Sequence, residues 1–442
     1  MRLSTRKLLD KAFSSIGIFS LVLMSAVVLV FLVPVFVKGS NAFIFRETVE
    51  GRKFFYQSEK FRRGNEQGLK KEIQACEKAR APVYKMIADY EEECGWETSK
   101  VKKIKELVRK ILGPLPGDEE VVMERKKYGQ TRWDRTLFYV DRLLYKVEYD
   151  YSVPGEMGIP VKVERSREYK GTAVEPLFSY MDENIEAMMN PQLKFYWRFL
   201  TDVEVDAHFF GGIWASILGT FYLIIGSMLI AAPFGIISAI YLTMYAGDNW
   251  FVSLIRICIS TLAGVPSVVF GLFGLAVFIY TFHISEGKSI LVGSITLSLL
   301  LLPTVIRASE EALRAVPKTY AEASMGLGAT KWTTIVKVIL PAALPGIITG
   351  IIISMGRAAG ETAPIMFTAA LAMGDPIAPS EVFTDPSPVL PYSIYSIVSE
   401  HRAMDEIMHV PYGMVLTLIS LVILLNFSAI IIRARVSRKL RG

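Results

Sequence analysis

Long apolar blocks without charged residues are the feature of this sequence that most constrains its fold. A block of about 18 or more apolar residues predicts a membrane-spanning helix, because the bilayer offers no partner to an open backbone. We predict an all-α membrane protein with six transmembrane helices at Ile16–Val37, Gly212–Tyr241, Phe251–Phe282, Ile290–Ile306, Ala343–Leu371 and Pro411–Ile432. The fourth block is short for a straight span, so we expect its helix to extend into the polar residues that follow.

The first block is interpreted as a retained anchor. Its apolar run is longer than a typical signal-peptide core, and no small-x-small cleavage site ends it. Basic residues flank the outermost spans: Arg2, Arg6, Lys7 and Lys11 before the first, and Arg433, Arg435, Arg438, Lys439 and Arg441 after the last. The positive-inside rule then predicts a multi-pass protein of the cytoplasmic (inner) membrane with both termini in the cytoplasm, which an even number of spans allows.

Residues 38–210 form a different kind of polypeptide, rich in charge of both signs and without a span. The segment is large enough for a domain, and long domains cross membranes largely regardless of charge. We expect an extracytoplasmic insertion of mixed α and β structure. Residues 66–112 read mainly as helix with breaks at Pro82 and Gly95, and the alternating stretches at 146–149 and 161–164 favour strands. The predicted parts are therefore 1–37, 38–210 and 211–442.

Metal and disulfide chemistry receive little support. Three cysteines and four scattered histidines form no metal-binding pattern, and the net charge of +6 does not imply nucleic acid. Cys76 and Cys94 could form a disulfide only if the chain turns near Pro82, since one continuous helix would place them about 27 Å apart. Two thiols buried without a disulfide are the equal alternative. Gly287-Lys288-Ser289 lacks the spacing of a phosphate-binding loop, so we predict no nucleotide site and no catalytic residue in this chain.

The loop between the fourth and fifth spans, residues 307–341, is too patterned for a plain connector. Lys318–Met325 suits a short helix, Gly326 and Gly328 end it, and Thr330 can cap a second helix that reaches the membrane at Pro341. Arg307, Glu310, Glu311 and Arg314 could pair with one another at i, i+4 positions. The orientation above places this loop in the cytoplasm, where it would offer a surface to a partner.

The spacing of residues in this loop resembles the E-A-A-x3-G-x9-I-x-L-P motif of ABC importer permeases. The residues that carry the resemblance are Glu322, Ala323, Ser324, Gly328, Val338, Leu340 and Pro341. The resemblance implies that the Glu322 helix docks into a cytoplasmic ATPase and transmits its closure. An ordinary amphipathic loop is the alternative.

The membrane spans contain two unusual segments. Gly264-Val265-Pro266-Ser267, with Gly271 and Gly274, marks irregular backbone that either lines a cavity or packs through small residues. In the fifth span, the spacing of Gly346, Gly350, Ser354, Arg357, Glu361, Pro364 and Thr368 predicts one small, polar helix face within about 80°. Each intramembrane charge costs about 2.5–3.5 kcal/mol on insertion scales, so Arg357 and Glu361 either serve a solute pathway or join helices as a neutral pair.

Residues 356–364 closely resemble the G-R-A-x-G-E-T-A-P signature of phosphate permeases, and 249–273 resembles the A-type phosphate permease. The resemblance implies a type I ABC importer permease fold, with Arg357, Glu361, Ser354 and Thr362 on the phosphate pathway. It also implies a homologous second permease, an ATPase dimer that binds ATP and Mg, and an extracytoplasmic phosphate-binding protein. Another oxyanion such as sulfate or molybdate, or a membrane-anchored sensor or scaffold, are the alternatives. A scaffold would need neither an intramembrane Arg–Glu pair nor an ATPase-docking loop.

Overall fold

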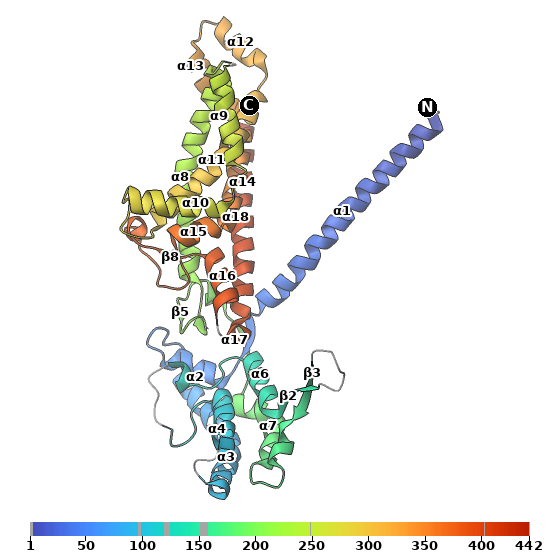
Figure 1. Cartoon of the computed structure of the whole chain (residues 1–442), viewed down its shortest axis with the longest axis vertical. Coiled ribbons are helices and arrows are strands. Elements are labelled where there is room, and N and C mark those ends of the chain that lie inside the picture. The colour runs from blue at the N-terminus through green and yellow to red at the C-terminus, as the bar shows by residue number, and fades with distance from the viewer. Residues whose placement is uncertain are drawn as a thin grey trace. The chain divides into compact units, whose positions relative to one another are not determined.

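The computed structural model describes residues 3–95, 99–118, 124–150, 158–247, 249–401 and 403–441 (Figure 1). Arg2, used above for orientation, lies outside the described residues. The chain divides into two compact units. We call Met1–Ala42 with Trp197–Gly442 the membrane unit, and Phe43–Tyr196 the insertion unit. The insertion unit begins five residues after the predicted boundary at 38 and ends 14 residues before the predicted boundary at 210.

The membrane unit is almost entirely helical. Its elements are α1 (Leu3–Ser40), η2 (Trp197–Leu200), β5 (Glu204–Val205), β6 (Phe210–Gly211), α8 (Trp214–Ile240), η3 (Tyr241–Tyr245), α9 (Trp250–Leu262), α10 (Ser267–Phe273), η4 (Gly274–Thr281), α11 (Ile290–Arg314), α12 (Lys318–Gly326), α13 (Lys331–Thr334), η5 (Ile335–Ile339), α14 (Leu340–Gly360), α15 (Ala363–Thr368), β7 (Ala370–Leu371), η6 (Glu381–Phe383), β8 (Ser387–Pro388), α16 (Leu390–Glu400), α17 (Met404–Ile407) and α18 (His409–Arg441). β5 pairs with β6 antiparallel, and β7 pairs with β8 parallel.

Within the described residues, five helices are long and apolar enough to cross a membrane, and a sixth span is possible if one bent pair of helices counts as one. α11 is the central helix: 67% of its most apolar stretch is buried, and it packs against both α8 and α14. It extends to Arg314, beyond the predicted end at Ile306, as expected for a span that was short by its apolar residues alone.

The bent pair corresponds to the predicted third span, and the irregular backbone predicted at Gly264-Val265-Pro266-Ser267 is confirmed as the position of its bend. Trp250–Leu262 and Ser267–Thr281 meet at 102°, so that α10 runs across the bundle in Figure 1. Ala263, Gly264 and Val265 form the bend, and Pro266 stands before the first residue of α10. Proline disfavours helical backbone in the residue before it, which explains why the helix ends here.

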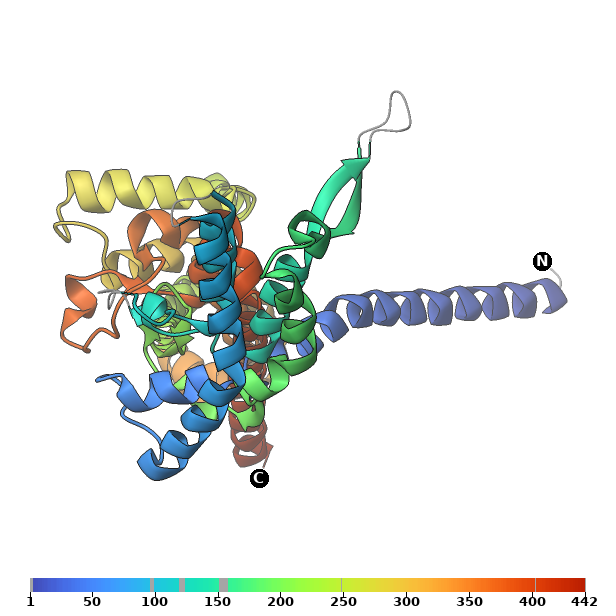
Figure 2. The same cartoon turned by 90° about the horizontal axis from the view of Figure 1, so that it is seen from below.

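The insertion unit contains both element types predicted for it. Its elements are β1 (Ile44–Glu47), α2 (Val49–Gln57), α3 (Glu66–Cys94), α4 (Ser99–Leu112), α5 (Glu124–Lys127), α6 (Trp133–Leu144), β2 (Tyr145–Asp150), β3 (Ile159–Glu164), η1 (Arg165–Tyr169), α7 (Glu175–Met189) and β4 (Gln192–Phe195). β1 pairs antiparallel with β4, and β2 with β3, so the predicted strands at 146–149 and 161–164 lie in one ribbon, visible in Figure 2. α3, α4, α6 and α7 enclose the core.

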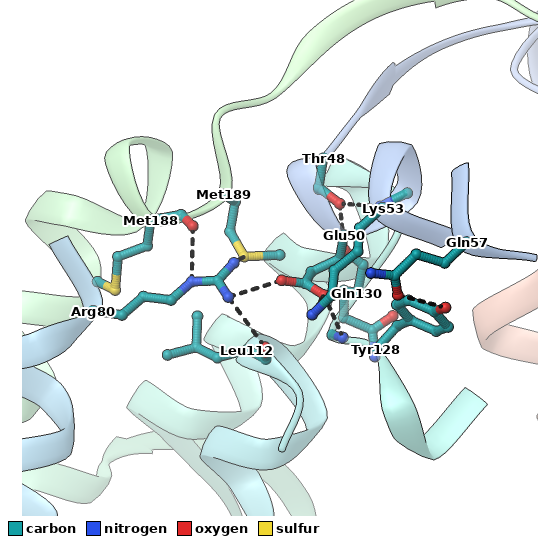
Figure 3. A network of polar contacts seen from close by, with 12 residues as sticks. Thr48, Glu50, Lys53, Gln57, Arg80, Leu112, Tyr128, Gln130, Met188 and Met189 are labelled. Atoms are coloured by element: carbon teal, nitrogen blue, oxygen red, sulfur yellow. Dashed lines mark hydrogen bonds and ion pairs between the residues drawn. The ribbon is translucent and has the colours of Figure 1, made fainter. Parts of the chain in front are cut away.

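A buried ion pair joins distant elements of this unit (Figure 3). Arg80 on α3 donates from Nη1 to Glu50 on α2 at 2.8 Å and from Nε to the Met188 carbonyl oxygen at 3.0 Å. The two charged side chains are only 7% and 5% exposed. Removing one partner of such a pair costs about 3–5 kcal/mol, because the other charge stays buried.

The predicted break at Pro82 is wrong, and this settles the question of the cysteines. α3 is one helix of 29 residues with Pro82 inside it, and it ends before Gly95, whose φ is 79°. Cys76 and Cys94 therefore lie too far apart along one helix to form a disulfide. Cys76 is buried and Cys94 is exposed, so the alternative of two buried thiols holds only for Cys76. Burial raises the pKa of the Cys76 thiol, which makes it less reactive.

Candidate functional site

The helix–turn–helix predicted between the fourth and fifth spans is present. α12 ends at Gly326, and Gly328 has a φ of 84°, in the left-handed region that favours glycine. The N–H of Gly328 donates to the Met325 carbonyl oxygen at 2.9 Å, which closes the turn. The Thr330 hydroxyl then accepts from the N–H of Thr333 at 3.2 Å and caps α13 as expected.

The loop is attached to the membrane-spanning helices at several points. The hydroxyls of Ser324 on α12 and Thr334 on α13 are 2.9 Å apart and hydrogen-bonded. Ala321 and Leu340 pack against a cluster that includes Leu313 at the end of α11. α12 is thus fixed to the spans on both sides of it, and a force applied to α12 would reach α11 and α14.

The outer surface of the loop is exposed and partly apolar. None of the residues of α12 is buried, and Glu322, Ala323 and Gly328 are exposed. Large apolar side chains stand beside them: Tyr320, Met325, Leu327 (91% exposed) and Trp332. Clustered exposed apolar side chains mark protein contact surfaces. Of the residues that carry the motif resemblance, Ser324, Leu340 and Pro341 are half-buried. Ser324 and Leu340 make the contacts with α13 and with the Leu313 cluster described above.

The predicted fifth span is interrupted, so the prediction of a continuous helix to Leu371 is wrong. α14 ends at Gly360, Glu361 has extended backbone (φ −73°, ψ 128°), and α15 begins at Ala363. Pro364 explains the break, because its ring clashes with the carbonyl of residue 360 in a continuous helix and it offers no N–H. The single polar face predicted from the spacing is consequently divided between two helices and the segment that joins them.

Arg357 and Glu361 come together at this break. Nε of Arg357 lies 3.1 Å from Oε1 of Glu361, and the side chains are 41% and 16% exposed. Among the residues that the structure describes, Nε is the one nitrogen of Arg357 with a protein partner. The terminal nitrogens of the guanidinium group therefore remain available to an anion.

The small residues of α14 have another role. A Cβ added at Gly346 or Gly350 would lie 2.7 Å or 2.4 Å from the Cβ of Ala312 or Ala308, so these glycines permit close packing against α11. Ser354 is fully buried, and its hydroxyl donates to the Gly350 carbonyl oxygen at 3.0 Å.

Ser354 is thus engaged within its own helix, and its place on a solute pathway remains a prediction. The same holds for Thr362, which is half-buried between α14 and α15.

The two interrupted spans pack against each other, which the sequence did not predict. A Cβ at Gly271 on α10 would lie 2.9 Å from Cα of Pro364, and one at Gly274 would lie 2.8 Å from Cγ2 of Thr368. The alternative of packing through small residues is therefore confirmed for these two glycines. Val265 in the bend packs against the cluster that contains Ala358 and Ala359. The combination of glycine and proline occurs in both spans, and it was the sequence signal from which this contact could have been predicted.

Comparisons with known proteins identify a family and several relatives of similar sequence. A family model described as binding-protein-dependent transport system inner membrane component matches residues 231–442. The probable ABC transporter permease protein YqgI of Bacillus subtilis is 36% identical over 195 residues, which cover 44% of this chain and 64% of that protein. The phosphate transport system permease protein PstA 1 of Mycobacterium tuberculosis is 35% identical over 248 residues, 56% of this chain and 77% of that protein. PstA of Yersinia pestis is 35% identical over 227 residues, 51% and 73% respectively.

Solved structures show a weaker likeness. An inward-facing structure of the MetNI methionine ABC transporter matches with a TM-score of 0.39 and 19% identity, over 51% of this chain and 97% of that chain. A bacterial ABC transporter involved in the import of the acidic polysaccharide alginate matches with a TM-score of 0.39 and 15% identity, over 59% and 90%.

Proposed function

Because the chain belongs to the binding-protein-dependent transport system inner membrane components, we propose that it is one permease subunit of an ATP-driven importer for inorganic phosphate. The relatives named phosphate transport system permease proteins support the substrate. In this proposal the bent pair α9–η4 counts as the third of six spans, both termini lie in the cytoplasm, and the insertion unit lies outside. A second permease, an ATPase dimer and an extracytoplasmic phosphate-binding protein complete the importer.

We call residues 307–341 the coupling loop. In this proposal, ATP hydrolysis by the ATPase dimer moves this loop. ATP and Mg would bind to the ATPase dimer and not to this chain. The exposed Tyr320, Leu327 and Trp332 would be covered by the ATPase, and Glu322 would lie at that contact. The attachment of α12 to Leu313 and Thr334 supports the proposal, because it gives ATPase closure a route to α11 and α14.

The observation that carries the substrate assignment is the Arg357–Glu361 pair at the α14–α15 break. Phosphate has one to two negative charges near neutral pH, and the terminal nitrogens of a guanidinium group match its oxygens. Glu361 holds Arg357 through Nε alone, so the side chain is oriented while its other donors stay available. Glu361 would also limit anion affinity, so that phosphate can leave.

Uptake of labelled phosphate tests this assignment against a purely structural pair. Arg357→Lys keeps the charge but loses the planar donor group, so it should impair uptake, and Arg357→Gln should nearly abolish it. Glu361→Gln should slow phosphate release. The exposed Arg435 supplies a control, since Arg435→Gln removes the same charge elsewhere. Labelled sulfate and molybdate, offered in parallel, distinguish phosphate from other oxyanions.

A pair that only joins helices predicts a different pattern. Each single substitution would then lower the amount of assembled complex, and the double variant Arg357→Gln with Glu361→Gln would restore it. Normal phosphate uptake by the double variant would refute the substrate-pathway assignment. Assembled protein in the membrane and phosphate uptake are therefore measured side by side.

A further inference from the structure

The β1–β4 sheet of the insertion unit has an exposed apolar face. Ile44 of β1 is paired with Phe195 of β4. Two residues along each strand, Arg46 is paired with Leu193, so all four side chains point to one side of the sheet. Ile44 is 49% exposed, Phe195 66% and Leu193 77%. Exposed apolar side chains that lie beside one another mark contacts with another protein or with a membrane.

The charged side chains of this sheet are directed away from that face or are neutralised. Glu47 is buried on the opposite face and forms an ion pair with Lys194, whose ammonium group lies 4.1 Å from the centre of the Phe55 ring. Arg46 on the apolar face is paired with Glu186 at 3.2 Å. An antiparallel sheet with one face in water commonly has its apolar residues on the packed face and its polar residues on the exposed one. Here the arrangement is reversed, which indicates that the apolar face does not meet water.

The chain itself keeps this face close to the end of the first span. α1 ends at Ser40 and Ile44 follows four residues later, so even an extended connection places them within about 14 Å of each other. The N–H of Ala42 donates to the Gly39 carbonyl oxygen at 3.1 Å, so the connection contains a turn and is shorter than that. β4 leaves the sheet at the same end, because its last residue, Phe195, is the one paired with Ile44.

We propose that the apolar face of the β1–β4 sheet lies against phospholipid in the interfacial layer of the bilayer, on the side of the membrane where α1 ends. The polar layer on each side of the hydrocarbon core is about 5–8 Å thick, which the connection from α1 can reach. Trp197, two residues beyond Phe195 in the chain, is also exposed, and tryptophan is enriched at this depth.

The depth follows from the backbone of the sheet. Among the described residues β1 and β4 form a sheet of two strands, so each strand has one edge without a neighbouring strand. Headgroups and water can hydrogen-bond such an edge, whereas hydrocarbon cannot. The side chains of Leu193 and Phe195 would therefore enter the boundary between headgroups and acyl chains while the backbone stays at the level of the headgroups.

This inference rests neither on the phosphate assignment nor on the orientation of the chain, since the sheet follows α1 on whichever side that helix ends. The alternative is a protein that covers the face, such as the second permease of the proposed importer (the companion permease) or the phosphate-binding protein. Lipid is favoured because the bilayer lies within reach of the connection in every state of assembly. In addition, the charge on this face, Arg46, is already paired within the unit.

The test is fluorescence quenching of the full-length chain, purified with its companion permease and placed in phospholipid nanodiscs. A bimane group is attached at Leu193→Cys, in a background in which the exposed Cys94 and Cys258 are replaced by serine. Lipids that carry a nitroxide at the headgroup boundary should quench the larger part of the bimane emission, and iodide in the water should quench little of it. A label at Ile44→Cys should behave in the same way.

The β2–β3 ribbon of the same unit supplies the controls. Val147 is 53% exposed and lies far beyond α1 in the chain, so a label at Val147→Cys should be quenched by iodide and not by the nitroxide lipids. Phe195→Glu, at an exposed position, should shift the Leu193→Cys label from lipid quenching towards iodide quenching. Val161→Glu places the same charge on the exposed ribbon and should leave the label at 193 unchanged.

Three outcomes would overturn the proposal. Quenching of the label at 193 by iodide and not by the nitroxide lipids would show that the face lies in water. Protection from both quenchers would show that a protein covers it. Equal lipid quenching at Val147→Cys would show that the sheet is not what places this unit on the membrane.

Discussion

Gly328 offers the sharpest test of the coupling loop. Its φ of 84° lies where residues with a Cβ are strained. Among the described residues, and apart from its two chain neighbours, no atom lies within 4 Å of the position that a Cβ would take. A substitution therefore acts through backbone conformation alone and not through a clash. For an L-residue the left-handed conformation costs about 1–2 kcal/mol, and more for a β-branched side chain.

This conformational cost lowers the fraction of molecules in which the loop has the turn seen in the structure. A strain of about 1–2 kcal/mol shifts the equilibrium between this turn and other conformations about 5- to 30-fold. Gly328→Val should therefore reduce phosphate uptake and transport-coupled ATP hydrolysis by up to that factor, while the protein still inserts and binds its companion permease. Gly328→Asn should retain most activity, since asparagine tolerates left-handed backbone.

Gly326 supplies the matched control, because a Cβ added there would also meet open space, but its backbone lacks a positive φ. Gly326→Ala should leave uptake unchanged. Uptake is measured in membrane vesicles at equal amounts of assembled complex. Normal transport by Gly328→Val, or an equal loss in Gly326→Ala, would refute the reasoning.

Three further predictions concern packing, topology and acid stability. Gly350→Val should lower the amount of assembled protein, because its side chain meets Ala308 on α11, and Ala308→Gly should partly restore it; no rescue would mean that the contact is not decisive. Protease added to spheroplasts should cut within the insertion unit and leave the Glu322 loop intact, and cleavage at that loop instead would invert the topology. The hydrogen bond from Arg109 lowers the pKa of Asp118 below its ordinary value of 3.8, so its stabilisation is present above that value and is lost as the pH falls through the lowered pKa. Asp118→Asn should speed hydrogen exchange around 115–118 at neutral pH in the purified protein, and the difference from the parent should shrink on acidification; a pH-independent difference would contradict this.

Much of the candidate site could be predicted from local sequence. The left-handed turn at Gly328 and the cap at Thr330 depend on a few neighbouring residues, so their positions could be inferred before the structure was known. The spans could be inferred for a similar reason, since the length and apolarity of a segment are properties of that segment. The ATPase-docking role of Glu322 and the phosphate role of Arg357 came from family resemblance and remain proposals.

Local sequence did not predict which prolines end a helix. Pro82, Pro303 and Pro345 lie inside helices that continue, whereas helices end beside Pro266 and before Pro364. Proline can therefore lie within a helix or end one, because contacts with a neighbouring helix determine whether an interrupted backbone is stabilised. Here α10 and α15 support each other through the contact of Gly271 with Pro364.

By itself the sequence determined which segments are apolar enough to span a membrane, where the loop turns and which charged residues lie among the spans. Tertiary structure decided which of those charges meet. Arg357 pairs with Glu361 across a helix break, whereas Arg307, equally close to Glu311 in sequence, donates to Ser260 on another helix. Spacing along a helix brings side chains within reach of each other, but the partner of each one depends on what the neighbouring helices place beside it.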